Sequence, residues 1–287
     1  MDNAISKSLV PAFQATTSDC DLKKIICHYE TFVNVKIIMS KKHFYSLFAV
    51  AVIVVLLVIA GCQSRTPTEV IFFDVGQGDA ALIQEGETQV LIDGGPARSI
   101  IDKLGERMPY YDREIEVVIL THADSDHFAG LIDVFERYEV KTFVWTGALN
   151  QGKDFKLFQE RLANEGAEEI IAKAGDGFEI GVARLEILYP LTKNEFRGQT
   201  PKDLNETSVV ARLDAPKISI LFPGDAGFEV EDILLNRKAN IKAEILKAGH
   251  HGSKNSTSPA WLAAVAPREI VFSVGEKNRF GHPAGET

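Results

Sequence analysis

Five of the seven histidines of the 287-residue chain lie in three short segments, one of which also carries two aspartates. Residues 121–127 read Thr-His-Ala-Asp-Ser-Asp-His, residues 249–253 read Gly-His-His-Gly-Ser, and residues 281–283 read Gly-His-Pro. Imidazole and carboxylate at this density are typical ligands of divalent cations such as Zn²⁺ or Mn²⁺. The candidate metal ligands in the first two segments are His122, Asp124, Asp126, His127, His250 and His251. A solvated polar loop is the alternative interpretation of the first segment.

The positions of the cysteines and the net charge limit which metal sites and which substrates are possible. The cysteines are Cys20, Cys27 and Cys62, so a thiolate zinc site or a disulfide framework after Cys62 is excluded. The whole chain carries a net charge of −9, and leaving out residues 1–61 gives 25 basic and 36 acidic residues, or −11. An acidic body argues against broad electrostatic capture of nucleic acid. A polyanionic substrate stays possible, because bound metal ions invert the charge of a local site.

The N-terminal region has the features of an export signal. Lys41 and Lys42 precede an apolar run over residues 44–61, and the small residues before Cys62 resemble the bacterial lipobox. That resemblance implies lipidation of Cys62. An uncleaved membrane anchor is the alternative, and either would place the body of the protein outside the bacterial cytoplasm.

These features predict four segments. We expect residues 1–38 to be a gene-model extension or disordered, with translation beginning at Met39. The remaining segments are a signal peptide or anchor over residues 39–62, a tether over residues 63–68 and a folded domain over residues 69–287.

Hydrophobic patterning predicts an α/β (α+β) domain in which strands and helices alternate. Strands are expected at 70–75, 80–84, 89–92, 116–120, 141–145, 169–172, 183–188, 208–213, 218–222, 243–247 and 269–274. Helices are expected at 99–108, 130–138, 155–165, 228–236 and 258–265. Ligand-type residues follow strands at Asp93, His122, Asp225 and His250, so loops on one edge of a sheet scaffold can bring them to a single site.

Several ordered segments resemble the metallo-β-lactamase superfamily, and more narrowly the hydrolase domain of ComEC-type competence proteins. They are residues 73–80, 121–127, 205–210, 247–253 and 273–275, together with 281–283. The resemblance covers about residue 69 to the end. It implies a four-layer αββα sandwich with two metal ions at one end of the sheets. Because family members usually continue further, we expect the chain to be truncated at its C-terminus.

The chemistry expected of this site is hydrolysis by a hydroxide that two metal ions activate. His122 and Asp124 could reach one ion, and Asp126 with His127 a second. Asp225 would bridge the two ions, and by family analogy either His250 or His251 completes the second site. Asp126 is also the candidate catalytic residue, because it could orient the nucleophile.

Other residues are expected to support the site or to face the substrate. Asp93 would support the histidine loop, and backbone amides near Gln77 and Asp79 could face the substrate or phosphate. Lys247 is either a phosphate contact or an ordinary surface lysine, and His282 is either substrate-facing or structural. Asn205 and Ser208 stand where the commoner superfamily pattern has a further histidine. Asp124 also replaces a histidine, so the site is richer in oxygen, and Mn²⁺ competes with Zn²⁺.

Three functions fit these expectations. The first is a phosphodiesterase or nuclease that acts outside the cytoplasm on DNA or nucleotides. The second is an ester or lactone hydrolase on the same scaffold, and the third is a non-catalytic metal- or DNA-binding lipoprotein of an uptake system. The sequence identifies no protein partner.

Overall fold

The computed structural model describes residues 41–61 and 66–285. These two ranges belong to two separate units of the chain. In the first unit, helix α1 spans Lys41–Gly61. Among the described residues, no helix combines the length and the apolarity needed to cross a membrane. Cys62, and with it the expected lipidation site, lies outside the described residues, as do the expected extension at 1–38 and residues 63–65 of the expected tether.

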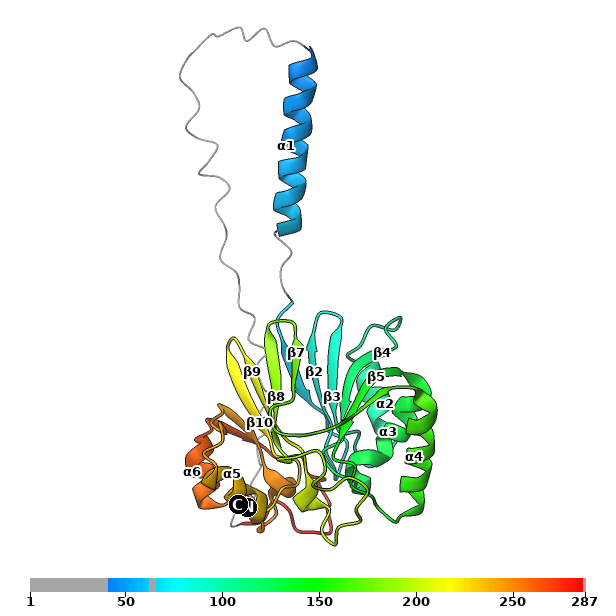
Figure 1. The fold of residues 1–287 in the computed structure, drawn as a ribbon, viewed down its shortest axis with the longest axis vertical. Coiled ribbons are helices and arrows are strands. Elements are labelled where there is room, and N and C mark those ends of the chain that lie inside the picture. Colours follow the sequence, from blue (N-terminus) through cyan, green and yellow to red (C-terminus); the bar gives the residue numbers. More distant parts are fainter. Residues whose placement is uncertain (1–40, 62–65, 286–287) are drawn as a thin grey trace, which may run out of the picture. The chain divides into compact units, whose positions relative to one another are not determined.

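The second unit contains two six-stranded sheets (Figure 1). In the first sheet the strands follow chain order: β1 (Glu69–Phe72), β2 (Ala81–Glu85), β3 (Thr88–Ile92), β4 (Glu114–Ile119), β5 (Glu139–Trp145) and β6 (Glu168–Ile171). The second sheet has the order β12 (Glu269–Val271), β11 (Ile245–Lys247), β10 (Ile218–Phe222), β9 (Val210–Ala215), β8 (Ala183–Tyr189) and β7 (Gly177–Ile180). β3 to β6 are mutually parallel, and so are β10 to β12.

Helices cover the outer faces of both sheets. The first sheet carries α2 (Ser99–Gly105), α3 (Ser125–Arg137) and α4 (Lys153–Glu165), and the second carries α5 (Phe228–Asn236) and α6 (Pro259–Val265). Two short 3₁₀ turns, η2 (Asn205–Thr207) and η3 (Gly249–Gly252), lie near the candidate site. This is the expected αββα order of layers.

The layering follows from the period of two in each strand, which points successive side chains to opposite faces. Leu82 packs into the core beneath α2 to α4, whereas its neighbour Ile83 packs into the core between the sheets. The same alternation separates Leu91 from Val90. On the second sheet, Leu221 faces the core beneath α5 and α6.

Most predicted elements are present, with shifted ends, and three aromatic residues expected in the core are buried: Trp145, Phe155 and Phe158. One difference affects the site, because α3 begins at Ser125 rather than at residue 130. Asp126 and His127 therefore lie in the first turn of a helix and not in a loop. The strand β7 has no counterpart in the prediction; two of its four residues are exposed, so its hydrophobic pattern is weak.

Candidate metal centre

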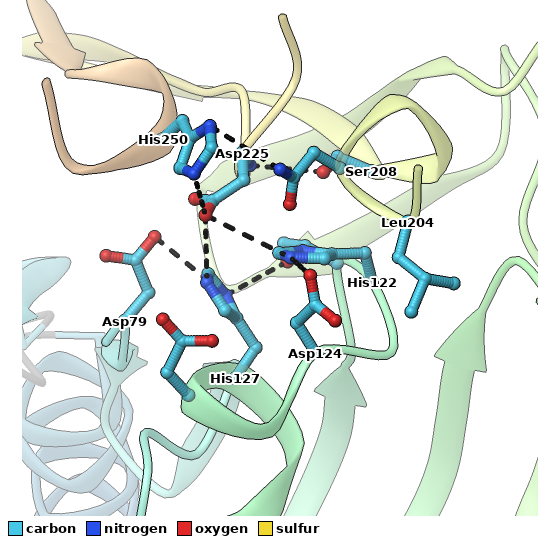
Figure 2. Close-up of polar contacts among 12 residues, drawn as sticks. Asp79, His122, Asp124, His127, Leu204, Ser208, Asp225 and His250 are labelled. Carbon is cyan, nitrogen blue, oxygen red and sulfur yellow. Dashed lines mark hydrogen bonds and ion pairs between the residues drawn. The ribbon is translucent and has the colours of Figure 1, made fainter. Parts of the chain in front are cut away.

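The ligand-type residues lie together at one end of the two sheets, where parallel strands finish (Figure 2). Asp93 follows β3 and His122 follows β4, and these strands pair in register, with Ile92 opposite Ile119. In the second sheet, Asp225 follows β10 and His251 follows β11. Each sheet therefore supplies part of one cluster.

The Asp225 carboxylate is at the centre of this cluster. Its Oδ2 atom lies 3.2 Å from Nε2 of His251 and 3.4 Å from Nε2 of His127. The Nε2 atoms of His122 and His250 are each 4.0 Å from the same oxygen. Four imidazoles thus converge on one carboxylate, although their residues are separated by more than a hundred positions in the chain.

The Nε2 atoms of His122, His127 and His251 are buried and make no hydrogen bond with any residue that the structure describes. Buried polar atoms in native proteins are nearly always partnered, so three such atoms around one carboxylate indicate a missing ligand. Each offers a lone pair when its ring carries the proton on Nδ1. The arrangement fits a divalent cation, which takes neutral imidazole and carboxylate ligands.

The opposite nitrogen of each ring has a partner that fixes its orientation. Nδ1 of His127 lies 2.8 Å from Oδ2 of Asp93, and Nδ1 of His251 lies 2.8 Å from the carbonyl oxygen of Ser273. Nδ1 of His122 lies 3.1 Å from the Thr121 hydroxyl, which itself donates to Asp93 at 2.7 Å. Such contacts direct Nε2 toward a metal ion.

Within the cluster, two smaller groups can be distinguished. Nε2 of His122 lies 3.5 Å from Oδ2 of Asp124, beside Asp225. Nε2 of His251 lies 3.3 Å from Oδ2 of Asp126, and these atoms and a ring nitrogen of His127 all lie within 4.8 Å of one another. A ring nitrogen of His127 also lies within the same limit of His122 and Asp225, so this residue contacts both groups, and the division of the ligands between two ions stays a prediction.

His250 and His251 differ in their surroundings. The His251 side chain is 2% exposed and contacts both Asp126 and Asp225, whereas the His250 side chain is 29% exposed at the edge of the cluster. Nδ1 of His250 lies 3.5 Å from the side-chain nitrogen of Asn205. Both histidines adopt left-handed backbone conformations, with φ of 46° and 55°, which are uncommon outside glycine and recur at functional sites.

The charged groups of the cluster shift one another's pKa values. Burial disfavours the charged forms, but the carboxylates outweigh this effect and raise the pKa of His127 well above its usual value and that of His251 to about 9. Burial acts in the same way on Asp225, yet His127, His251 and Lys247 hold its pKa well below the usual range. Without bound ions, protons therefore occupy the imidazoles that a cation would need.

Lys247 is buried, so its interpretation as an ordinary surface lysine is wrong. Its ammonium group pairs with Asp79, lies 3.4 Å from Oδ1 of Asp225 and donates to the carbonyl oxygen of Gly224 at 3.2 Å. Asp79 is buried too, and its Oδ1 lies 3.6 Å from Nδ1 of His251. The lysine therefore compensates acidic charge behind the cluster.

The loop at residues 76–79 packs directly on the backbone of α3. A Cβ atom at Gly78 would lie 2.3 Å from the carbonyl oxygen of Asp126, and the amide of Asp79 donates to that same oxygen at 3.3 Å. The amide of Gly76 donates to the Asp74 side chain. These two amides are therefore engaged within the protein and are unavailable to a substrate.

The remaining predicted residues surround the cluster. The Ser208 hydroxyl accepts a hydrogen bond from the amide of Asp225 at 3.1 Å. Oε1 of Gln77 accepts from the amide of Gly275 at 3.2 Å and so ties two loops together. The His282 ring stacks near His251, with 6.4 Å between ring centroids. Sequence reasoning assigned no role to Thr121 and Ser273, although both lie in segments that carry the resemblance.

Comparison with known proteins agrees with the family resemblance noted in the sequence. Residues 73–275 match the metallo-beta-lactamase superfamily. The chain is 32% identical over 249 residues to ComE operon protein 3 of Bacillus subtilis, covering 79% of this chain and 31% of that protein. It is 28% identical over 239 residues to competence protein ComA of Neisseria gonorrhoeae, with the same shares covered. The chain thus spans less than a third of the length of these relatives.

Among solved structures, the fold is similar to that of the metallo-beta-lactamase fold protein YhfI from Bacillus subtilis. The two are 14% identical, the match covers 77% of this chain and 91% of that one, and the TM-score is 0.49.

Proposed function

Because the chain belongs to the metallo-beta-lactamase superfamily, with the expected likeness to ComEC-type competence proteins, we propose that it is a metal-dependent hydrolase of phosphodiesters, with DNA or nucleotides as its substrate class. The observation that carries the proposal is the set of three buried, unpartnered Nε2 atoms directed at Asp225. The similarity to a competence protein of Neisseria gonorrhoeae supports the choice of DNA.

The donor set fits divalent ions. We assign His122, Asp124 and Asp225 to one ion, and Asp126, His127, His251 and again Asp225 to a second. His250 is left out because it is partly exposed and lies at the edge of the cluster. With three histidines and three aspartates, the site is rich in oxygen, so Mn²⁺ and Zn²⁺ are both suitable occupants. Bound ions would supply Lewis acidity and an activated water at neutral pH.

The chain's own residues would then position and orient the reactants. Of the two carboxylates that contact His251 Nε2, Asp126 is more accessible to an incoming water, because its side chain is 31% exposed and that of Asp225 is 3% exposed. Its backbone carbonyl is held by the amide of Asp79, and its position in the first turn of α3 fixes the side chain. We propose that Asp126 accepts a hydrogen bond from the nucleophilic water and orients it.

Metal-stripped full-length protein, reloaded with Mn²⁺ or Zn²⁺, tests this function on bis-p-nitrophenyl phosphate, single-stranded DNA, a lactone and nitrocefin. We expect phosphodiester turnover that depends on the ion and falls by at least about a hundredfold in Asp126→Asn. The matched control is Asp133→Asn, an aspartate of the same helix that pairs with Arg98 on the surface. Turnover of the lactone alone would replace the proposal by an ester hydrolase, and metal binding without any turnover would replace it by a binding protein.

We further propose that the protein acts outside the cytoplasm on a lipid anchor at Cys62. Support comes from the sequence: Lys41 and Lys42, the apolar run that follows them, and the small residues before the cysteine. Mass spectrometry of the protein from membrane fractions should find a lipid-modified Cys62 at the N-terminus. An unmodified cysteine preceded by an intact residue 61 would rule out this processing.

A further inference from the structure

A groove of about 390 Å³ opens beside the candidate metal centre. One wall is the start of α3, with Ser125 and Asp126, and Gln77 lies next to it. The other wall is the loop at residues 277–280, within the red segment of Figure 1. Because Asp126 contacts His251 at 3.3 Å, the groove ends at the cluster itself.

The loop that forms the second wall is held in shape by Asn278. Its side-chain nitrogen donates to the carbonyl oxygens of Gly275 at 3.0 Å and His282 at 2.8 Å. Its side-chain oxygen accepts from the amides of Phe280 and His282. One amide side chain therefore organises both ends of the loop, and its neighbours face outward from a fixed backbone.

Those neighbours are two cations and an aromatic ring. Lys277, Arg279 and Phe280 are exposed, and the Phe280 side chain is 56% exposed. The Arg279 guanidinium lies over the Phe280 ring, 5.1 Å from its centroid, and the His282 ring also stacks with Phe280, with 5.8 Å between the ring centroids. An arginine stacked on an aromatic ring is a platform on which a nucleobase can lie.

The charge of this wall contrasts with the rest of the chain. Residues 62–287 carry −11, yet two cations stand within four positions at the groove. Residues 276–280 include Glu276 as well, so this loop carries a net charge of +1 in an acidic body, and the Asp126 carboxylate lies on the other wall. An exposed lysine ammonium at such a place can pair with phosphate.

We infer that this groove binds a single-stranded polynucleotide and leads its backbone to the metal centre. Lys277 pairs with a phosphate, and the stacked Arg279 and Phe280 carry a base. The inference rests on the proposed function, because it takes the substrate to be a phosphodiester. It goes beyond that function in naming a polymer rather than a mononucleotide, and in assigning residues outside the metal cluster to its recognition.

Binding can be tested without turnover. Fluorescence anisotropy of labelled dT12 and U12 is measured with the full-length protein in EDTA, across a range of salt concentrations. Lys277→Gln with Arg279→Gln should weaken binding at least tenfold at low salt and reduce the slope of log Kd against log salt by about 0.7 per lost phosphate contact. Phe280→Leu should weaken binding at least about fivefold.

The controls alter similar residues outside the groove: Lys156→Gln with Arg237→Gln for charge, and Tyr110→Leu, whose side chain is 87% exposed, for the aromatic ring. Equal weakening in the control variants, or none in the groove variants, would overturn the inference. So would failure of the wild-type protein to bind either oligonucleotide. Binding of only one of the two oligonucleotides would support the groove and show that it discriminates between them, through the 2′-hydroxyl or the thymine methyl group.

Hydrolysis of bis-p-nitrophenyl phosphate by the wild-type protein is measured separately. Its absence together with groove-dependent binding would refute the hydrolase and leave the groove as a binding site. Hydrolysis of this compound without groove-dependent binding would support the hydrolase and refute the groove as a binding site.

Discussion

Replacing Lys247 by methionine tests whether the acidic side chains behind the candidate metal centre depend on this buried cation. The Lys247 ammonium pairs with Asp79 and lies 3.4 Å from Asp225, and both carboxylates are buried. Removing one partner of a buried ion pair leaves an uncompensated charge and costs about 3–5 kcal/mol. For a domain of this size that corresponds to a fall in Tm of roughly 6–20 °C.

A bound cation should reduce this loss, because its charge compensates the same carboxylates. The loss that would remain is mainly that of the hydrogen bond to the Gly224 carbonyl, about 1–3 kcal/mol. Thermal and urea unfolding of Lys247→Met and of the wild-type protein, each in EDTA and in excess Zn²⁺, measures both values. The stabilisation by zinc should therefore be larger in the variant than in the wild type.

Lys141→Met is the matched control, because Nζ of Lys141 lies 2.8 Å from Glu114 and 2.6 Å from Glu139 on the surface. Exposed ion pairs contribute about 0–1 kcal/mol, so this variant should unfold almost as the wild type does, with or without zinc. Two results would refute the reasoning. One is that Lys247→Met in EDTA lowers the free energy of unfolding no more than the control variant does. The other is that Lys247→Met lowers the free energy of unfolding by the same amount in zinc as in EDTA.

Four further outcomes are expected. Gly130→Ala should lower the free energy of unfolding by at least about 1–3 kcal/mol, because the new Cβ would lie 2.0 Å from the Gly94 carbonyl oxygen. Urea titrations measure this loss, and Gly105→Ala is the control because the space around Gly105 is open. Zinc affinity of the metal-free protein should rise at least about tenfold per pH unit between about 6.5 and 9, since the proton of His251, with its pKa of about 9, and that of His127, whose pKa is also raised, must both leave; calorimetry in buffers of different ionisation enthalpy should show their release. Over the same interval the metal-free protein should lose stability, because the folded state keeps a proton that the unfolded state has released; a flat profile would contradict the raised pKa. His251→Ala should weaken zinc binding at least about tenfold and more than His250→Ala, and the reverse order would exchange their roles.

Hydrophobic periodicity predicted most of the strands and helices, the family resemblance implied the layered fold, and the residues expected at the site lie together in the structure. Strand β10 and helix α5 have the predicted bounds, because each has a clear apolar pattern and a residue that favours its end. Pro223-Gly224 follows β10, and Asn236 is the last residue of α5. The start of α3 was missed because residues 124–126 are polar and Gly130 resembles a helix boundary. In the structure, Gly130 is inside the helix, where only hydrogen fits against Gly94.

The environment of Lys247 and the distinction between His250 and His251 could not be read from the sequence. Adjacent histidines in a left-handed turn point in directions that depend on the turn itself, and no spacing rule gives that geometry. The burial of Lys247 follows from Asp79, which lies 168 positions earlier in the chain and reaches it only after the sheets have packed. The interaction of Asn278 with its loop was missed for a similar reason, since its four contacts are local but its loop has no hydrophobic pattern.

The division of the cluster between the two sheets has a consequence for biosynthesis. His122, Asp126 and His127 leave the ribosome about a hundred residues before Asp225 and His251, and the nascent chain cannot assemble the complete donor set until the second sheet has been made. A cation captured early would meet only half of its ligands. Loading should therefore be one of the last steps of maturation, and the occupied centre should fasten the two halves of the sandwich to each other.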